Sequence, residues 1–257
     1  MATNRLTQKE LRAPDAFQRA GGEARRWLEQ RRTLVFVGAG ALVVLALAAA
    51  ILSSLAARRE QQAARALGAA LKTLDRPVGE AIPGDEQKPY VTQSEKDRAL
   101  VQAVTPVRAD YKKTVSATTG ALPLGDAELR LSRPDGALPL LEDFVAKSPS
   151  SQILRVSGLE SQGYAWEAKG QLDRALEAFE RMSREDGGGF LAGMGLYHRA
   201  RVLLLMGKKL EAADAFQEVV SAKPGTAAAA LAEDRLGLLA AEGVRPKPMA
   251  TVGTDAG

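Results

Sequence analysis

The chain has 257 residues, of which 46% are hydrophobic and 5% aromatic, and it contains no cysteine. The absence of cysteine excludes disulfides, thiolate metal ligands, cysteine nucleophiles and lipoprotein acylation. The formal charge of +4 comes entirely from residues 1–32, which hold eight Lys or Arg against four Asp or Glu. The pI of 9.4 therefore describes a short basic segment and gives no support to nucleic-acid binding.

Residues 33–57 form an apolar run of 25 positions without a charged side chain, bounded by Arg31 and Arg32 before it and by Arg58 and Arg59 after it. A helix of this length reaches roughly 37 Å, which is enough to cross a hydrocarbon core of about 30 Å. A cleaved signal peptide is the alternative, but its apolar stretch has about 7 to 15 residues and begins near the N-terminus. We therefore predict a retained transmembrane helix over 33–57.

The basic segment 1–32 indicates an orientation for this helix. Its surplus of Lys and Arg favours the cytoplasmic side of the membrane, which places the following domain on the opposite side. Apolar side chains between Phe17 and Leu28 recur at helical spacing. This segment is therefore either an interfacial amphipathic helix or a basic flank against anionic lipid headgroups.

Residues 58–136 are predicted to form a helical stalk with linkers. The helix continues past the apolar run, and Pro77 opens a linker rich in Pro and Gly. The Thr-Gln-Ser-Glu sequence of residues 92–95 fits a capping box that begins another helix.

Prolines interrupt the rest of this stalk. Pro106 is expected to kink or split the helix in which it lies, because it lacks a backbone N–H. Pro123 and Pro134 lie in a stretch from about residue 118 to 136, which we predict to be irregular for the same reason. This stretch would separate the stalk from the C-terminal domain.

Residues 137–243 predict a succession of helices with tight turns, and the pattern repeats. The sequence GYAWEAKGQLDRALEAFERM recurs in outline in HRARVLLLMGKKLEAADAFQEVV at an offset of 37 residues, and a third, incomplete copy begins near Leu236. The positions that define the two complete copies are Gly163, Trp166, Gly170, Ala175 and Phe179 in the first, and Ala200, Leu203, Gly207, Ala212 and Phe216 in the second.

This pattern resembles the tetratricopeptide repeat (TPR), in which small residues let antiparallel helices approach closely, an aromatic ring fills the gap to the next repeat, and Gly closes the first helix. Pro224 stands where that repeat ends in proline, and residues 186–189, Asp-Gly-Gly-Gly, are interpreted as an inserted turn. Residues 137–149 are interpreted as the second helix of a preceding degenerate repeat.

The resemblance implies an all-α fold in which a single N-terminal transmembrane helix is followed by a tetratricopeptide-like helical-hairpin solenoid over 137–243. Residues 244–257 contain few apolar side chains and are expected to be a disordered tail.

The sequence offers little for catalysis. His198 is the only histidine and is expected on the surface of a repeat helix, so neither a catalytic triad nor a His-rich metal site gains support. We therefore expect no enzymatic activity, no cofactor and no metal. Repeat stacks instead bind extended partners in a concave groove. By analogy with the repeat family, the candidate groove residues are Glu160, Tyr164, Glu167, Tyr197 and Arg201.

The order of the parts, a basic segment with Phe17 and Trp27, one transmembrane helix and a small repeat domain, resembles the YfgM-type ancillary subunits of the bacterial SecYEG translocon. The resemblance implies an inner-membrane protein whose periplasmic repeats associate with the translocon and pass emerging chains to periplasmic chaperones. A scaffold for envelope or cell-division machinery, unrelated to the translocon, is the alternative. Both hypotheses make the chain a membrane-anchored protein-protein interaction scaffold that contacts lipid and protein but no nucleic acid.

Overall fold

The computed structural model describes residues 25, 27, 29–80, 88–149, 153–186 and 188–247. The chain divides into two compact units, Met1–Arg58 and Arg59–Gly257. The candidate interfacial helix of the basic segment lies almost entirely outside the described residues, and so does most of the predicted tail.

Helix α2 (Arg32–Leu71) contains the whole apolar run that the sequence indicates. In the first unit its large apolar side chains are exposed, as Leu34 at 68% and Phe36 at 75% illustrate. A continuous apolar surface of this kind is unfavourable in water and favours a lipid environment. By length and composition α2 can cross a membrane, and the described residues contain no second helix that meets this test.

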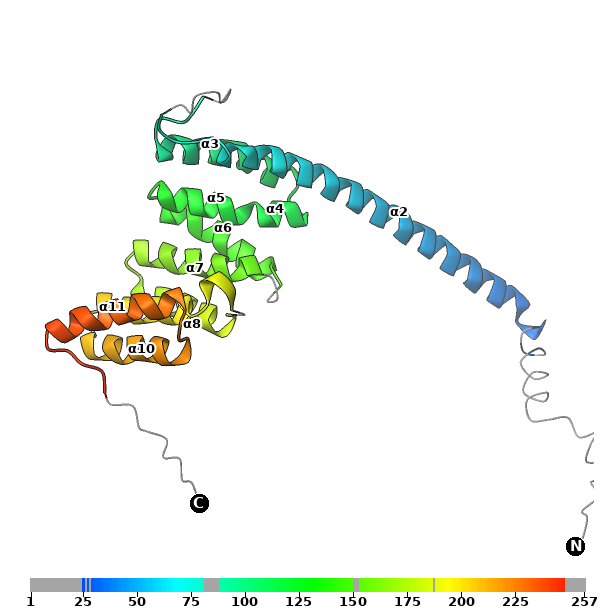
Figure 1. Ribbon diagram of the computed structural model, residues 1–257. Coiled ribbons are helices and arrows are strands. Elements are labelled where there is room, and N and C mark those ends of the chain that lie inside the picture. Colours follow the sequence, from blue (N-terminus) through cyan, green and yellow to red (C-terminus); the bar gives the residue numbers. More distant parts are fainter. Residues whose placement is uncertain are drawn as a thin grey trace, which may run out of the picture. The chain divides into compact units, whose positions relative to one another are not determined.

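The second unit is helical, and each helix from α5 to α11 packs mainly against the helices before and after it (Figure 1). Its described residues include no β-strand, only an isolated bridge between Val78 and Tyr90. After α2 come η1 (Lys72–Leu74), α3 (Gln93–Asp110), α4 (Val115–Thr119), α5 (Ala121–Arg130), α6 (Pro134–Lys147), α7 (Ile153–Ala168), α8 (Leu172–Arg184), η2 (Gly189–Leu191), α9 (Met194–Leu205), α10 (Lys209–Ala222) and α11 (Ala227–Ala241).

Helix α3 begins as predicted and continues through Pro106 to Asp110. The Thr92 hydroxyl accepts a hydrogen bond from the Glu95 N–H at 3.2 Å, which confirms the cap. Pro106 lies inside the helix and does not split it. The prediction of a split was wrong because Val104 and Val107 are both buried and hold the backbone on each side of the proline, whose own ring is exposed.

The stretch predicted to be irregular contains α4 and α5, and this is a second correction. Pro123 lies in the first turn of α5, where a helix has no internal acceptor for an N–H, so proline costs little there. Gly125 faces the Leu141 side chain of α6, and a Cβ at Gly125 would lie only 2.7 Å from Leu141 Cδ2. Helices α5 and α6 therefore form a tightly packed hairpin ahead of α7.

The hairpins turn in the same way. Gly170 has φ +72°, its N–H donates to the Glu167 carbonyl at 2.8 Å, and the Gln171 N–H donates to the Trp166 carbonyl at 2.9 Å. This is a Schellman motif, which suits glycine because the left-handed conformation brings no Cβ penalty. The same pair of backbone hydrogen bonds follows Gly207, Gly243 and Ser132, with φ values of +78°, +82° and +58°.

Helix α6 confirms the second helix of a preceding repeat predicted over 137–149, and Ser132 marks the turn that joins it to a first helix, α5, which the sequence did not indicate. This serine occupies the left-handed position between α5 and α6, 38 residues before Gly170, so α5–α6, α7–α8 and α9–α10 are three equivalent hairpins and α11 begins a fourth. The second helix of each complete hairpin buries one phenylalanine completely, and these are Phe144, Phe179 and Phe216. The insertion between repeats covers residues 185–193, between α8 and α9, and includes η2.

Candidate protein-binding surfaces

The structure brings four of the five candidate groove residues into one polar network between α7 and α9, together with His198. The Nε2 atom of His198 lies 3.0 Å from Oε1 of Glu160 and 3.2 Å from the Tyr164 hydroxyl. An ionised carboxylate only accepts hydrogen bonds, so this geometry requires Nε2 to carry the hydrogen that it donates to Glu160.

Arg201 and Glu167 form the second part of this network. Nη1 and Nη2 of Arg201 donate to the two carboxylate oxygens of Glu167 at 2.7 and 2.6 Å. Such a fork fixes both side chains in one plane. The guanidinium also lies 5.5 Å from the ring centre of Tyr164, within the range of a cation–π contact. The four residues therefore link the first helices of two successive repeats.

His198 is buried at 2% exposure, which corrects the prediction that it lies on the surface. Its ring packs against Phe179, Tyr164 and Tyr197 at centroid distances of 4.8, 5.1 and 5.5 Å. The Nδ1 atom has no hydrogen-bond partner among the described residues. An isolated histidine on a helix gives no sign of burial, because two of the rings that cover it, Phe179 and Tyr164, come from other helices.

Tyr197, the fifth candidate, is also buried, at 6% exposure. Its ring lies 5.7 Å from that of Phe216, in the core between α9 and α10. It therefore cannot line a groove, since its side chain points to the neighbouring helix within its own hairpin. The analogy with the repeat family placed Tyr197 in the groove because it treats equivalent positions of successive repeats as pointing in the same direction.

The electrostatics of the network favour structure over proton transfer. Burial, with a further contribution from the Glu160 charge, raises the pKa of Tyr164 to about 12, so its hydroxyl stays protonated at neutral pH. Its neighbours are already paired with one another. The described residues also contain no group of three or more His, Cys, Asp or Glu side chains placed to hold a metal ion.

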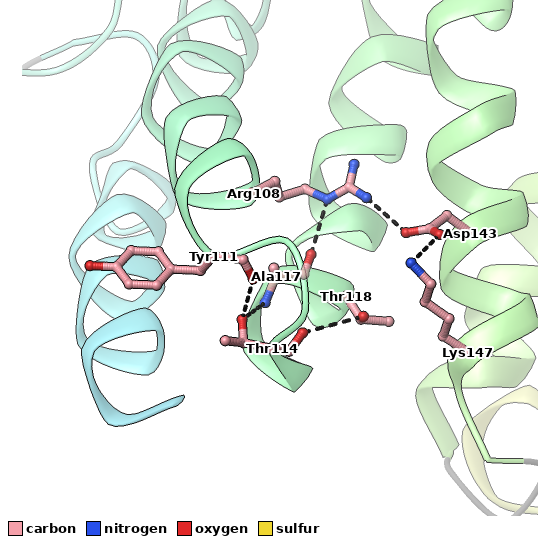
Figure 2. Close-up of polar contacts among 7 residues, drawn as sticks. All are labelled: Arg108, Tyr111, Thr114, Ala117, Thr118, Asp143 and Lys147. Carbon is pink, nitrogen blue, oxygen red and sulfur yellow. Dashed lines mark hydrogen bonds and ion pairs between the residues drawn. The ribbon is translucent and has the colours of Figure 1, made fainter. Parts of the chain in front are cut away.

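A second surface is a cleft lined by residues of α3, α4 and α6, and Figure 2 shows the polar contacts beside it. Arg108 of α3 donates from Nε to the Ala117 carbonyl at 3.0 Å and from Nη2 to Asp143 of α6 at 2.9 Å. Lys147 reaches the same carboxylate at 2.6 Å, so one acid neutralises part of the charge of two bases. Thr114 caps α4 by accepting from the Ala117 N–H at 3.1 Å. These contacts fix α4 against its neighbours.

A third surface is a cleft of about 250 Å³ between α6, α7 and α8. Gln162 and Trp166, which both belong to α7, line this cleft. Since Gln162 is two residues from both Glu160 and Tyr164, it lies on roughly the opposite side of that helix. The other residues that line the cleft are Glu142, Arg174, Glu177, Ala178 and Arg181. Sequence reasoning did not select Gln162, although a polar residue directly before the repeat position Gly163 was a visible signal.

A scan of family models and a search of curated proteins give no match. Among solved structures, the nearly identical TPR-like repeats of a candidate kinesin light chain from Podosopora anserina align at a TM-score of 0.50 with 20% identity, over 59% of this chain and 81% of that one. A second crystal structure, of a form of that protein with one substitution, gives the same TM-score at 21% identity. A crystal structure of MamA aligns at a TM-score of 0.42 with 21% identity, over 59% of this chain and 88% of MamA.

The likeness to the Podosopora anserina repeats and the recurring hairpins agree on one class. The chain is an all-α protein with a TPR-like helical repeat solenoid. At this level of identity the likeness concerns the fold, so the role of each surface rests on its own geometry.

Proposed function

We propose that this protein is a membrane-anchored scaffold that binds other proteins and catalyses no reaction. One observation carries the proposal: a single chain combines α2, an exposed apolar helix long enough to cross a membrane, with a TPR-like stack. Repeat stacks present a large surface for their length, on which extended partners bind. Anchoring such a stack raises its effective concentration near other membrane components without requiring any new contact.

The polar network between α7 and α9 supports a scaffold over an enzyme. Its carboxylates, Glu160 and Glu167, are already paired with His198 and Arg201. The raised pKa of Tyr164 disfavours a tyrosinate nucleophile. These side chains orient one repeat on the next, and thereby set the shape of the surface that a partner meets.

For the compartment, we propose that residues 1–32 are cytoplasmic and that the repeats lie in the periplasm of a bacterial inner membrane. The basic surplus of that segment supports this orientation. The proposed partners are the SecYEG translocon and periplasmic chaperones, in line with the order of the parts along the chain. A scaffold for envelope or cell-division machinery is the second candidate, which the same combination of anchor and repeats supports.

A topology fusion tests the compartment. A reporter active only in the periplasm and a reporter active only in the cytosol are each fused after Gly243, which closes α11. We expect activity from the periplasmic reporter alone. Activity from the cytosolic reporter alone would exclude both translocating chains and periplasmic chaperones as partners.

Crosslinking tests the partner class. The full-length protein is crosslinked in intact cells, extracted from the membrane with detergent and purified. A variant that ends before residue 59, and so keeps the apolar helix but lacks the repeats, is treated in the same way for comparison. We expect translocon subunits with the full-length chain only. Recovery of cell-division or envelope-assembly proteins instead would favour the second candidate, and equal recovery with the truncated variant would remove the repeats from the function.

A further inference from the structure

Gln162 is a buried polar residue without a partner. Its side chain is only 8% exposed, and Oε1 forms no hydrogen bond within the part of the chain that the structure describes. A buried acceptor without a donor costs free energy, so such groups are rare in native proteins. Leu159, one turn away on α7, is fully buried and apolar. Nothing in the packing of α7 therefore requires a carboxamide at position 162.

The walls of the cleft supply charges and a flat ring. Arg174 lies over the Trp166 ring at 4.5 Å from its centre, an arrangement that holds both groups in place. Arg181 is half-buried and forms no ion pair or side-chain hydrogen bond with the described residues. Glu142 and Glu177 are exposed at the rim. Neither of these carboxylates forms an ion pair with Arg181, and a half-buried guanidinium that forms no ion pair gains by meeting a carboxylate.

These features fit a peptide better than an isolated ion or an apolar ligand. The Gln162 carboxamide can donate to the backbone carbonyl of an extended chain through Nε2, whereas Oε1 is covered in this conformation and accepts from that chain only when the amide turns over. The flat Trp166 ring suits the backbone beside that residue. A space of about 250 Å³ holds one or two residues and not a folded domain.

We propose that the cleft between α6, α7 and α8 binds an extended peptide segment of a partner protein, with Gln162 hydrogen-bonded to its backbone and a carboxylate side chain of the peptide paired with Arg181. This inference rests on the proposed scaffold function and adds the location and chemistry of one docking site. The site lies on the side of α7 away from the Glu160–His198 network, so that the network and the docking site act separately.

An array of blocked octapeptides tests the proposal. Each peptide carries one Asp at a defined position in a mixed Ala, Ser and Val background, and a matched set carries Asn there. Full-length protein in detergent micelles is the probe. We expect binding to the Asp set in preference to the Asn set. Gln162→Leu should weaken binding to both sets by about tenfold, the range of a lost hydrogen bond at a buried acceptor. Arg181→Gln should abolish the preference for Asp.

Two substitutions outside the cleft serve as controls. Gln217→Leu repeats the first change on α10, and Arg184→Gln repeats the second one turn beyond Arg181 on α8; both should bind as the native chain does. Gln162→Leu should also unfold at an equal or higher temperature, because it removes an unpaired buried acceptor. That rise would show that lost binding does not reflect lost folding.

The proposal is overturned if the two cleft variants bind as the controls do, or if the native chain binds neither peptide set. Loss of stability in Gln162→Leu together with normal binding would also overturn it, since Gln162 would then be structural. Failure here is distinguishable from failure of the scaffold function. Partners that crosslink to the native chain and equally to Gln162→Leu would leave the scaffold intact and exclude this cleft.

Discussion

His198 of α9 and Glu160 of α7 are joined across two repeats, with Nε2 of the histidine 3.0 Å from Oε1 of the carboxylate. The histidine is buried, and its other ring nitrogen has no partner within the described residues. This part-buried hydrogen bond therefore links successive repeats, beside the Arg201–Glu167 pair that joins the same two helices. A bond in such surroundings is strong while it is complete and costly when one partner is lost.

We expect His198→Ala to lower the free energy of unfolding by about 2–4 kcal/mol, because it opens a cavity beside Phe179 and leaves Glu160 without its donor. Urea unfolding of the full-length protein in detergent, followed by circular dichroism, measures this change. A double-mutant cycle with Glu160→Gln should give a coupling of about 0.5–3 kcal/mol. Additive effects would contradict a direct link.

Gly163 is one of the positions in the α7–α8 hairpin that leave no room for a side chain. A Cβ there would lie 2.5 Å from Cε1 and Cζ of the Phe179 ring, which is itself fully buried. We expect Gly163→Ala to lower the free energy of unfolding by about 1–3 kcal/mol through overpacking. Gly237→Ala on α11 is the matched control, because a Cβ at Gly237 meets nothing within 4 Å.

The control should be neutral or stabilising by up to about 1 kcal/mol, as alanine is the better helix former. Thermal unfolding of the two variants side by side measures the difference. Equal effects of the two substitutions would show that the close approach of Phe179 to Gly163 is not what limits this position.

Ser132 occupies a left-handed turn at φ +58°, where the equivalent residue in the next repeat is Gly170. We expect Ser132→Gly to stabilise the protein by up to about 1 kcal/mol, since glycine adopts this conformation without the Cβ penalty. The reverse change, Gly170→Ser, should destabilise by a similar amount. Chemical denaturation of both variants checks the pair, and a loss of stability in Ser132→Gly would contradict the assigned turn.

Asp186 makes part of the stability dependent on pH. Burial alone would raise the pKa of its carboxyl, but the N–H groups of Gly193 and Gly188 and the ammonium of Lys223 together hold that pKa below its ordinary value of 3.8. A carboxyl with a lowered folded pKa stabilises the protein above its unfolded pKa, and this contribution disappears as the pH falls through the folded value.

We therefore expect Asp186→Asn to unfold at a lower temperature than the native chain at pH 7, and the gap to close as the pH falls below about 4. Melting temperatures from pH 7 to pH 2.5 measure this. A gap that stays constant down to the lowest pH would mean that the carboxylate charge does not stabilise the loop.

The sequence predicted most of the repeat stack because its signals are local. Glycine at 170, 207 and 243 marks each turn, since the left-handed conformation that closes a Schellman motif favours glycine whatever the rest of the fold does. The apolar run of 33–57 likewise predicts a helix suited to a membrane, and α2 includes all of it. Length and composition are enough for that inference.

Helix α6 confirms the second helix of a preceding repeat that the sequence predicts over 137–149, but α5 escaped prediction because two local signals pointed away from a hairpin. Ser132 stands in place of the turn glycine, and Pro123 suggests a loop. The packing of α5 against α6, including that of Gly125 against Leu141, holds these two segments together as a hairpin. A contact between two helices overrides a weak local preference, and no local pattern reports it.

The sequence by itself determined the class of fold, the repeat period, the turns and the candidate membrane helix, since these depend on residues close together in the chain. Only the tertiary structure decided that His198 and Tyr197 are buried, that Glu160 and Glu167 are paired, and that Gln162 is left without a partner. Burial and pairing depend on which side chains of other helices cover a position. That information is held by the packing of helices tens of residues apart, and not by the spacing within any one of them.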